Sequence, residues 1–358
     1  MRILCLTKYD RLGASSRLRF LQFIPFLRAH GFECEVRPIF DNEHIKAAYS
    51  KKRRPIDAAR ALLGRRRALR DIEQFDVVWL EGEIFPWSPW WLEKMFWPKS
   101  VPLIVDYDDA IFHNYDMHKS WLVRRLLDSK IDRVMKSANC VVAGNAYLAA
   151  RAESAGAKSI EIVPTVVNRN VYSVVPDRPK GPVTVGWIGS PSTWSAYLEP
   201  MLPIIEPLAK TRGTRLLAVG AYVDNHRSLG YVDFEEWNEQ SEVAQIQRMD
   251  IGIMPLVDSP WARGKCGYKL IQYMACGLPV VASPVGVNVE IVEHGVNGFL
   301  AEKGEDWRRA LEILAENHEI RDRMGKAGRE KFESNYSLQI QAPRVARIFQ
   351  DLVGNAPL

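Results

Sequence analysis

Short apolar runs alternate with helical patterns along the whole chain, and this alternation restricts the fold more than any other feature. In the first half the runs are brief and rich in Val, Ile and Leu, and they are Met1–Thr7, Glu33–Ile39, Val77–Leu80, Pro102–Asp106, Cys140–Ala143 and Ile160–Val163. Between them, apolar residues recur at helical spacing, for example over 18–27 and 121–135. Strands separated by helices predict an α/β protein with a parallel, doubly wound sheet.

The same alternation restarts in the second half. A polar break at Asp177–Pro182 precedes further strand-like runs, which are Val183–Ile188, Arg215–Val219, Ile251–Leu256 and Pro279–Ala282. A chain of 358 residues also exceeds the size of about 250–300 residues at which a single core stops growing. The sequence therefore predicts two α/β domains, 1–178 and 179–338, followed by a C-terminal segment, 339–358, that carries a last helix.

A lysine-bearing loop lies between the apolar run Ile251–Leu256 and the next helical stretch. Lys265, Gly267 and Lys269 stand where that helix begins, and Tyr268 lies between them. The N–H groups and the positive dipole end at the start of a helix favour an anion, and the lysines add full charges. These residues predict a binding site for a phosphate or diphosphate group, and Arg263 is a further candidate cation.

One loop follows the first strand of each half. Gly13, Ser15, Ser16 and Arg17 belong to the first loop, in which small residues allow close backbone approach and the arginine suits an anion. A helix cap with solvated arginines is the alternative reading. Gly189, Ser190 and Thr193 belong to the second loop, whose N–H groups and hydroxyls suit a phosphate. Neither loop has the spacing of a Walker loop or of the dinucleotide fingerprint.

Carboxylates gather after the run Pro102–Asp106. Asp106, Asp108 and Asp109 are expensive to group without compensation, which a cation, an arginine or substrate hydroxyls would provide. Hydroxyl recognition or base chemistry, helix capping and Mg²⁺ binding all stay open from the residues alone. Asn288 and Glu290, at the start of a later helix, are candidates for substrate contact. Glu290 would hold ribose or sugar hydroxyls, or is an ordinary first-turn acid.

Positive charge is concentrated in one segment, although the net charge is only +5. Lys46–Arg70 contains ten Lys and Arg residues, which are Lys46, Lys51, Lys52, Arg53, Arg54, Arg60, Arg65, Arg66, Arg67 and Arg70. Aromatic residues interleaved with prolines follow over Trp79–Trp97. A solvated helix face, an anionic membrane surface and a nucleic acid are the three readings, and the tryptophans favour the membrane over nucleic acid.

The compartment is predicted from cysteines and hydropathy. The five cysteines form no CxxC pair, and apolar runs surround Cys5 and Cys140, which indicates reduced thiols in a cytosol. We see neither a secretory signal nor an apolar stretch of the ~20 residues that a spanning helix needs. A cytoplasmic protein is expected, with peripheral attachment to the inner face of the plasma membrane as a separate prediction.

Taken together, these motifs resemble those of the retaining glycosyltransferases of family four. The resemblance is carried by Gly13–Arg19 (GASSRLR), Val105–Phe112 (VDYDDAIF), Gly186–Thr193 (GWIGSPST) and Lys269–Val281 (KLIQYMACGLPVV), together with the Gly286–Glu290 and Gly295–Gly298 segments. It implies the GT-B architecture, in which two Rossmann-like domains face each other across a cleft and the C-terminal helix, here 339–358, crosses back to the first domain.

The resemblance also implies an activity. This is metal-independent transfer of a sugar, with retention, from a UDP- or GDP-linked donor on the second domain to a lipid-linked or oligosaccharide acceptor on the first, in bacterial surface-polysaccharide synthesis. No cofactor and no nucleic acid are implied. A non-catalytic sugar-nucleotide or polysaccharide-binding subunit and a GT-B epimerase or hydrolase are the alternatives.

Roles for single residues follow from the same resemblance. Lys269, with Arg263 and Lys265, would neutralise the leaving diphosphate, Gln272 and Glu290 would hold ribose and sugar, and Asp108 or Asp109 would orient the acceptor. The sequence departs from the family at one pattern. The family carries a Glu, seven residues and a second Glu, and these positions are Gly264 and Gln272 here.

Overall fold

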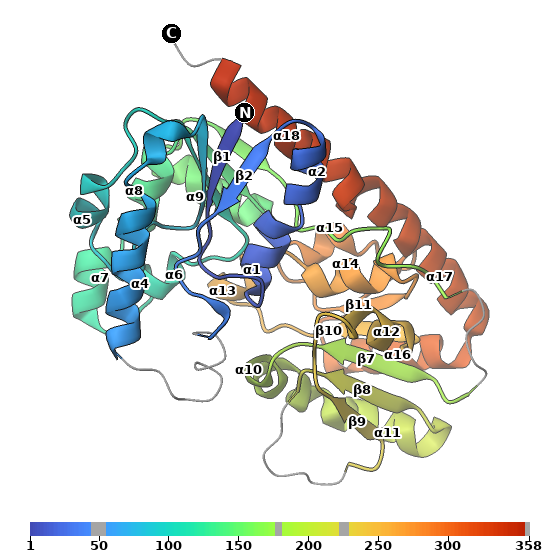
Figure 1. Ribbon diagram of the computed structural model, residues 1–358. Helices are drawn as coiled ribbons and strands as arrows, with labels where there is room; N and C mark the ends of the chain where they lie inside the picture. Colours follow the sequence, from blue (N-terminus) through green and yellow to red (C-terminus); the bar gives the residue numbers. More distant parts are fainter. Residues whose placement is uncertain (44–54, 176–180, 222–228, 355–358) are drawn as a thin grey trace. The chain divides into compact units, whose positions relative to one another are not determined.

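The chain forms two compact units, each built on one sheet (Figure 1). The computed structural model describes residues 1–43, 55–175, 181–221 and 229–354. Unit 1 comprises Met1–Thr165, Gly264–Cys266 and Gln341–Leu358, and unit 2 comprises Val166–Arg263 and Gly267–Ile340. The three residues Gly264–Cys266 thus belong to unit 1, although the chain on both sides of them belongs to unit 2.

Unit 1 contains a six-stranded sheet in the order β2-β1-β3-β4-β5-β6, and every pairing is parallel. Its strands are β1 Arg2–Leu6, β2 Glu33–Val36, β3 Val77–Glu81, β4 Leu103–Tyr107, β5 Cys140–Ala143 and β6 Ile160–Ile162. Its helices are α1 Ala14–Ser16, η1 Arg17–Leu21, α2 Ile24–Ala29, α4 Pro55–Ala68, η2 Ile72–Gln74, α5 Trp90–Met95, α6 His113–Asp116, α7 Trp121–Leu127, α8 Lys130–Ser137 and α9 Ala146–Ala155.

Unit 2 has a second parallel sheet of six strands, in the order β12-β11-β10-β7-β8-β9. Its strands are β7 Thr184–Ile188, β8 Arg215–Val219, β9 Val232–Glu235, β10 Ile251–Met254, β11 Val280–Ala282 and β12 Gly298–Leu300. Its helices are α10 Pro191–Thr193, η3 Trp194–Leu198, η4 Glu199–Met201, α11 Leu202–Arg212, α12 Glu242–Gln247, α13 Pro260–Arg263, α14 Tyr268–Ala275, α15 Asn288–Ile291, α16 Gly304–Glu316, α17 His318–Lys331 and η5 Phe332–Tyr336.

The predicted strands are confirmed as members of two parallel sheets, and two strands were not predicted. β9 and β12 are short, and only Val232 and Gly298 of their residues are buried. Such segments lack the continuous apolar run that marks a strand buried on both faces.

The two units do not divide where the sequence predicted. The predicted break, Asp177–Pro182, falls largely on residues 176–180, which lie outside the described residues. The described division lies earlier, between Thr165 and Val166. The reason is visible at Val167, whose N–H donates to the Tyr336 carbonyl and whose carbonyl accepts from the Leu338 N–H, so this segment is bonded within unit 2.

The last helix, α18 (Leu338–Gly354), contributes its larger part to unit 1. Phe349 is buried with its ring centroid 5.2 Å from that of Trp79, and Arg344 pairs with Glu161 at 2.9 Å. This agrees with the expected return of the final helix to the first domain.

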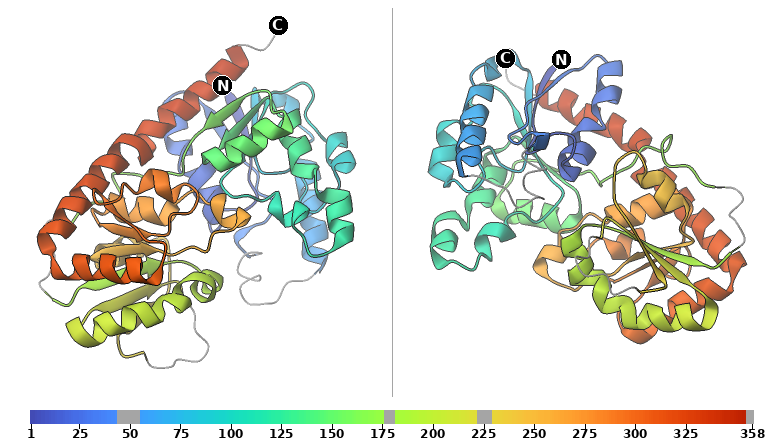
Figure 2. Two further views of the ribbon diagram at one scale, coloured as in Figure 1. Left: turned by 180° about the vertical axis from the view of Figure 1, so that it is seen from behind. Right: turned by 60° about the horizontal axis from the view of Figure 1, so that its bottom comes forward.

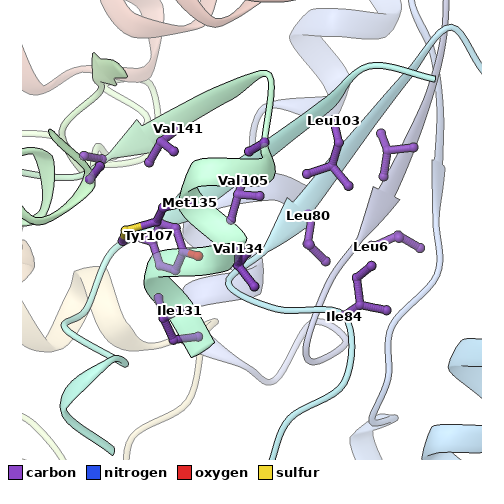
Figure 3. Close-up of a cluster of buried hydrophobic side chains, with 14 of the residues drawn as sticks. Leu6, Leu80, Ile84, Leu103, Val105, Tyr107, Ile131, Val134, Met135 and Val141 are labelled. Carbon is purple, nitrogen blue, oxygen red and sulfur yellow. The ribbon is translucent and has the colours of Figure 1, made fainter. Parts of the chain in front are cut away.

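The core of unit 1 fills the space between one sheet face and α8 (Figure 3). Apolar side chains from four adjacent strands meet Ile131, Val134 and Met135 of this helix, and they include Leu6, Leu80, Leu103, Val105 and Val141. Parallel strands covered on both faces need such continuous apolar runs, which is why periodicity in the sequence located them.

We expect Leu103→Ala to lower the free energy of unfolding by about 2–5 kcal/mol, because Leu103 is fully buried and the change leaves a cavity. Leu63→Ala is the matched control, since Leu63 on α4 is 55% exposed and its truncation should cost less than about 0.5 kcal/mol. Urea unfolding followed by circular dichroism measures both values. Equal costs at the two positions would contradict this packing.

Candidate functional site

Unit 2 has a topological switch point beside its first strand, β7. Strand β8 pairs with one side of β7 and β10 with the other, so the loops after β7 and β10 leave the sheet in opposite directions. Open parallel sheets bind ligands outside the carboxyl ends of strands at such a point. The loop Gly189–Thr193 follows β7, and the segment leading to α14 follows β10.

The loop after β7 is held by its own hydroxyl groups. The Ser190 N–H donates to Thr193 Oγ1 at 2.9 Å, and Thr193 Oγ1 lies 3.0 Å from the Ser190 carbonyl, to which it donates. A Cβ at Gly189 would lie 2.3 Å from the Trp187 ring, so the position excludes a side chain. The predicted residues Gly189, Ser190 and Thr193 are therefore brought together, with Ser190 and Thr193 bonded to each other.

Helix α14 begins with an electrostatic conflict. Gly267 is its N-cap with φ 66°, it supplies no side-chain cap, and the first turn holds no acidic residue. Lys269 stands in that turn, where a cation opposes the helix dipole at a cost of about 0.3–1 kcal/mol. Its ammonium lies 4.4 Å from the centroid of the buried Trp187 ring, so Lys269 is directed to the end of β7. An anion at this point would remove the conflict.

Arg263 has a carboxylate partner close to it in the sequence. It forms a two-pronged ion pair with Asp258, with Nε and Nη2 each 2.8 Å from a carboxylate oxygen, and both side chains are about half exposed. This ion pair lies at the surface, where such pairs contribute little, so the role of Arg263 in neutralising a diphosphate stays a prediction.

Gln272 belongs to a buried network and does not present its side chain to solvent. It is 1% exposed, and its Nε2 donates to the Tyr172 hydroxyl at 2.9 Å. Tyr172 in turn donates to Glu242, which also accepts from Trp237 Nε1 at 2.6 Å, and the Tyr268 hydroxyl lies 3.4 Å from that of Tyr172. The prediction that Gln272 holds ribose hydroxyls is therefore corrected, because the amide is enclosed and bonded within unit 2.

Asn288 and Glu290 differ in how far their side chains are exposed to solvent. Asn288 is 1% exposed and its Nδ2 donates to the Ser283 carbonyl at 3.0 Å, so its predicted substrate contact is also corrected to a structural role. Glu290 is exposed, and its backbone carbonyl accepts a hydrogen bond from Lys331 Nζ at 2.6 Å. Only Glu290 of this pair keeps a side chain in solvent.

Unit 1 also has a switch point, between β1 and β3, and the Gly13–Arg17 segment follows β1 there. A Cβ at Gly13 would lie 2.3 Å from that of Tyr9, which requires glycine. Ser16 is fully buried and its Oγ donates to Glu81 at 2.6 Å, so its predicted substrate contact is corrected to an internal bond. Arg17 is buried and donates to the Arg11 carbonyl at 3.2 Å, while Ser15 stays half-buried.

Sequence reasoning missed Glu81, the last residue of β3. Its Oε2 accepts from Ser16 Oγ and, at 2.7 Å, from the Lys8 N–H. Burial raises the pKa of this carboxyl to about 7, against the hydrogen bond from Ser16. The available signal was its place directly after the apolar run Val77–Leu80, at the same sheet edge as Asp108 and Asp109.

Asp109 has the same tendency to hold a proton. Burial raises its pKa to about 7, Lys265 opposes the shift, and Asp108 adds to it. The structure thus brings Lys265, Asp108 and Asp109 into electrostatic reach of one another within unit 1. Carboxyls with pKa values near neutrality suit acid–base chemistry and hydrogen bonding to hydroxyls.

Asp106, the third carboxylate of the cluster, is structural. Arg19 binds both of its oxygens, with Nε at 2.7 Å and Nη2 at 3.2 Å, and also donates to the Val163 carbonyl. Both side chains are almost fully buried, so an arginine is the compensating group for Asp106, one of the three alternatives that the sequence left open.

Hydrogen bonds hold the segment Gly264–Cys266 within unit 1. The Asn145 amide donates to the Gly264 and Lys265 carbonyls at 2.9 and 3.0 Å, and the Cys266 thiol donates to the Asp108 carbonyl at 3.0 Å. A Cβ at Gly264 would lie 2.5 Å from that of Ala110. A glutamate side chain would therefore not fit where Gly264 packs.

The basic and aromatic segments are only partly exposed. Arg65 is 1% exposed and donates to the carbonyls of Arg37 and Thr7, and Trp79 and Phe85 are buried, so these three cannot contribute to a membrane surface. Lys46 and Lys51–Arg54 lie outside the described residues, as does the side chain of Arg60. Arg66, Arg67 and Arg70 are exposed.

Two kinds of feature are absent from the described residues. No group of three or more His, Cys, Asp or Glu side chains there is arranged to hold a metal ion. Within the same residues, no helix combines the length and apolar character needed to cross a bilayer.

We expect Glu81→Gln to gain stability relative to the wild type as pH rises from 5 to 8. The Glu81 pKa is about 7 when folded and 4.5 in the reference state, so between these values the folded protein keeps a proton that the unfolded chain has lost. Wild-type stability therefore falls across this window, and the neutral amide escapes that fall. Urea unfolding at both pH values, with the exposed Glu73→Gln as control, measures the difference; a pH-independent difference would contradict the assignment.

The similarity in sequence to known proteins lies mainly in unit 2. Residues 182–317 match the family model described as glycosyl transferases group 1. The glycosyltransferase MJ1178 of Methanocaldococcus jannaschii is 35% identical over 88 residues, which cover 24% of this chain and 25% of that protein. Matches to the curated relatives span between 22% and 30% of their own lengths.

Solved structures extend the similarity to the whole chain. Sucrose-phosphate synthase of Thermosynechococcus elongatus has a TM-score of 0.75 at 14% identity and covers 99% of this chain and 100% of its own. The Anabaena protein Alr3699/HepE, in complex with UDP-glucose, has a TM-score of 0.68 at 16% identity, with 98% and 100% coverage. The expected GT-B fold class is confirmed by these neighbours, and the match to glycosyl transferases group 1 extends over residues 182–317.

Proposed function

We propose that the protein is a glycosyltransferase that moves a sugar from a nucleotide-diphosphate-sugar donor to a lipid-linked or polysaccharide acceptor. The match of residues 182–317 to a glycosyltransferase family supports the reaction class, and this stretch includes α14 and the loop after β7. A structural neighbour determined with UDP-glucose supports a nucleotide-sugar donor, UDP- or GDP-linked.

One observation carries the proposal, and it is the cation in the first turn of α14. Lys269 opposes the helix dipole there, with no acidic residue in the first turn and no side-chain cap on the helix. A bound diphosphate would accept hydrogen bonds from first-turn N–H groups and pair with the ammonium. Charge grows on the diphosphate as the bond to the sugar breaks, so Lys269 would stabilise the transition state more than the ground state.

Other residues are assigned supporting roles. Lys265 adds a charge four residues earlier in the sequence, and the loop of Gly189 and Ser190 lies at the same edge of unit 2 as Trp187, the contact of Lys269. Asp108 or Asp109 would orient the acceptor hydroxyl or the transferred sugar. Retention without a protein nucleophile and without a metal ion is part of the proposal, with departure and attack on one face of the sugar.

We also propose a cellular setting for this reaction. Synthesis of bacterial surface polysaccharide places donors in the cytoplasm and lipid-linked acceptors at the inner face of the plasma membrane. Peripheral attachment through exposed residues of the basic Lys46–Arg70 segment and the aromatic Trp79–Trp97 segment would bring the enzyme to such an acceptor.

A second candidate function has one observation in its favour. Gly264 and Gln272 stand at the family's two glutamate positions, the first closed by Ala110 and the second buried. A non-catalytic subunit that binds a sugar nucleotide or a polysaccharide needs no such pair. A GT-B epimerase or a hydrolase, in which water replaces the acceptor, is the alternative within enzymes.

We expect Lys269→Ala to abolish thermal stabilisation by the nucleotide sugar that stabilises the wild type in a screen of UDP- and GDP-linked donors. Where turnover is measurable, its rate should fall by about 10²–10³-fold, as for other lost charge-stabilising donors. Lys326→Ala, an exposed lysine of unit 2, is the control and should bind as the wild type does. Unchanged binding and turnover in the Lys269 variant would refute its role.

Incubation with a donor alone should release little free sugar, because a transferase shields the reaction from water until an acceptor is bound. Chromatography of the products with and without a lipid or oligosaccharide acceptor tests this. Rapid release of free sugar would indicate a hydrolase, a donor with altered stereochemistry would indicate an epimerase, and binding without any product would indicate the non-catalytic subunit.

A further inference from the structure

Helices α5 and α7 of unit 1 present large apolar side chains to solvent. Six residues on or beside these helices are between 50% and 69% exposed, and they are Trp87, Trp91, Met95, Trp121, Leu122 and Leu126. We call this set the α5–α7 face. Single exposed apolar residues are ordinary, but a group that includes three tryptophans marks an interaction surface.

The α5–α7 face is one region of the molecule. The Trp87 ring lies 5.7 Å from that of His118, just before α7, and the Trp87 N–H donates to the Tyr115 hydroxyl at 3.0 Å. Lys130, which begins α8 directly after α7, lies 3.1 Å from Glu93 of α5. Figures 1 and 2 show α5 and α7 side by side at the same margin of unit 1 in opposite views.

The backbone under this face is held firmly. Lys130 bonds Glu83 and the Phe85 carbonyl as well as Glu93, and all three charged side chains are buried. Trp87 has φ 62°, and among the described residues no other non-glycine residue has a positive φ. Such strain costs of order 1–3 kcal/mol and is characteristic of functional positions. At Trp87 this backbone conformation places the indole in solvent, so burial of the ring does not compensate for the strain.

The exposed charges on α5 and α7 themselves are positive, although the exposed Asp128 caps the C-terminal end of α7. Lys94 on α5 and Arg124 and Arg125 on α7 are exposed, whereas the one acid of α5, Glu93, is buried and α7 contains none. Arg66 of α4 extends the positive charge, because its guanidinium lies 5.7 Å from the Phe96 ring beside α5. The exposed surface of both helices is therefore apolar and cationic.

We infer that the α5–α7 face docks on the surface of an anionic lipid bilayer. Tryptophan and long apolar side chains favour the boundary between headgroups and acyl chains, and lysines and arginines beside them bind anionic headgroups. This docking surface differs from the one the sequence predicted, since Arg65, Trp79 and Phe85 are buried while Trp121, Leu122 and Leu126 join it. The inference rests on the membrane attachment proposed above and names its surface, but it requires no turnover, so the proposed reaction can fail without it.

Cosedimentation with vesicles tests the inference on the full chain. Vesicles of phosphatidylglycerol and phosphatidylcholine at low salt should recover the wild type, and vesicles of phosphatidylcholine alone should recover much less. Trp91→Ala with Trp121→Ala should lower the partition coefficient at least about tenfold. Neutralisation by Arg124→Gln with Arg125→Gln should lower it about 25-fold, on the order of fivefold per charge.

Control variants remove exposed apolar side chains and exposed arginines on unit 2. Val257→Ala with Val171→Ala removes apolar surface that is 65% and 55% exposed, and Arg309→Gln with Arg323→Gln removes two exposed charges. Both controls should bind vesicles as the wild type does, and circular dichroism and the unfolding midpoint should match the wild type in every variant. Donor stabilisation should also persist in the α5–α7 variants, which separates this inference from the proposed function.

Absence of wild-type binding to anionic vesicles would overturn the inference. So would binding that the α5–α7 variants leave intact, or that falls equally in the unit 2 controls. A dimer that Trp91→Ala with Trp121→Ala converts to a monomer, without vesicle binding, would assign the face to a second copy of the chain instead.

Discussion

Parallel strand pairing is the constraint on which the rest of the structure depends. All strands of a parallel sheet deliver their carboxyl ends to one edge, so polar loops gather there while the apolar strands lie buried between helices. In unit 1 this edge carries Glu81, Asp108 and Asp109, and in unit 2 it carries Gly189, Ser190 and the segment that leads to Lys269. The position of each of these groups at one edge of its sheet follows from the direction of the strands.

Glycine packing adds a second constraint with a chemical consequence. Gly264 has no room for a side chain beside Ala110, and Asn145 and the Cys266 thiol fasten its segment to unit 1. The glutamate that the family carries at this position is therefore excluded by shape. The neighbouring Lys265 acts on Asp109, where its positive charge lowers the pKa of the carboxyl and so opposes the rise that burial causes.

Sequence periodicity predicted most strands and their parallel arrangement because the central strands, such as β3, β4 and β10, are buried on both faces and so need a continuous apolar run. The same reasoning located Lys269, since helix starts are marked by a glycine and a change of period. It could not foresee that Arg19 pairs with Asp106 or that Arg65 is enclosed, because burial of a long cation depends on distant carbonyl and carboxylate partners. Nor could it find Glu81, whose Ser16 partner lies 65 residues away in the sequence.

Exposure was the other property that sequence patterns could not supply. Trp79 and Trp91 have similar neighbours in the sequence, yet the first packs against Phe20 and Phe349 while the second lies in solvent. The helix of Trp121 reads as an ordinary amphipathic helix, although its apolar residues are divided between the core and the surface. Which ring is buried depends on tertiary packing.

The central claim is that the start of α14 binds a diphosphate, and a crystal structure of the protein with a nucleoside diphosphate tests it most directly. We expect phosphate oxygens within hydrogen-bond distance of the N–H groups of Tyr268 or Lys269 and of the Lys269 ammonium. A nucleotide bound elsewhere, with this helix end occupied by the protein's own side chains, would contradict the account.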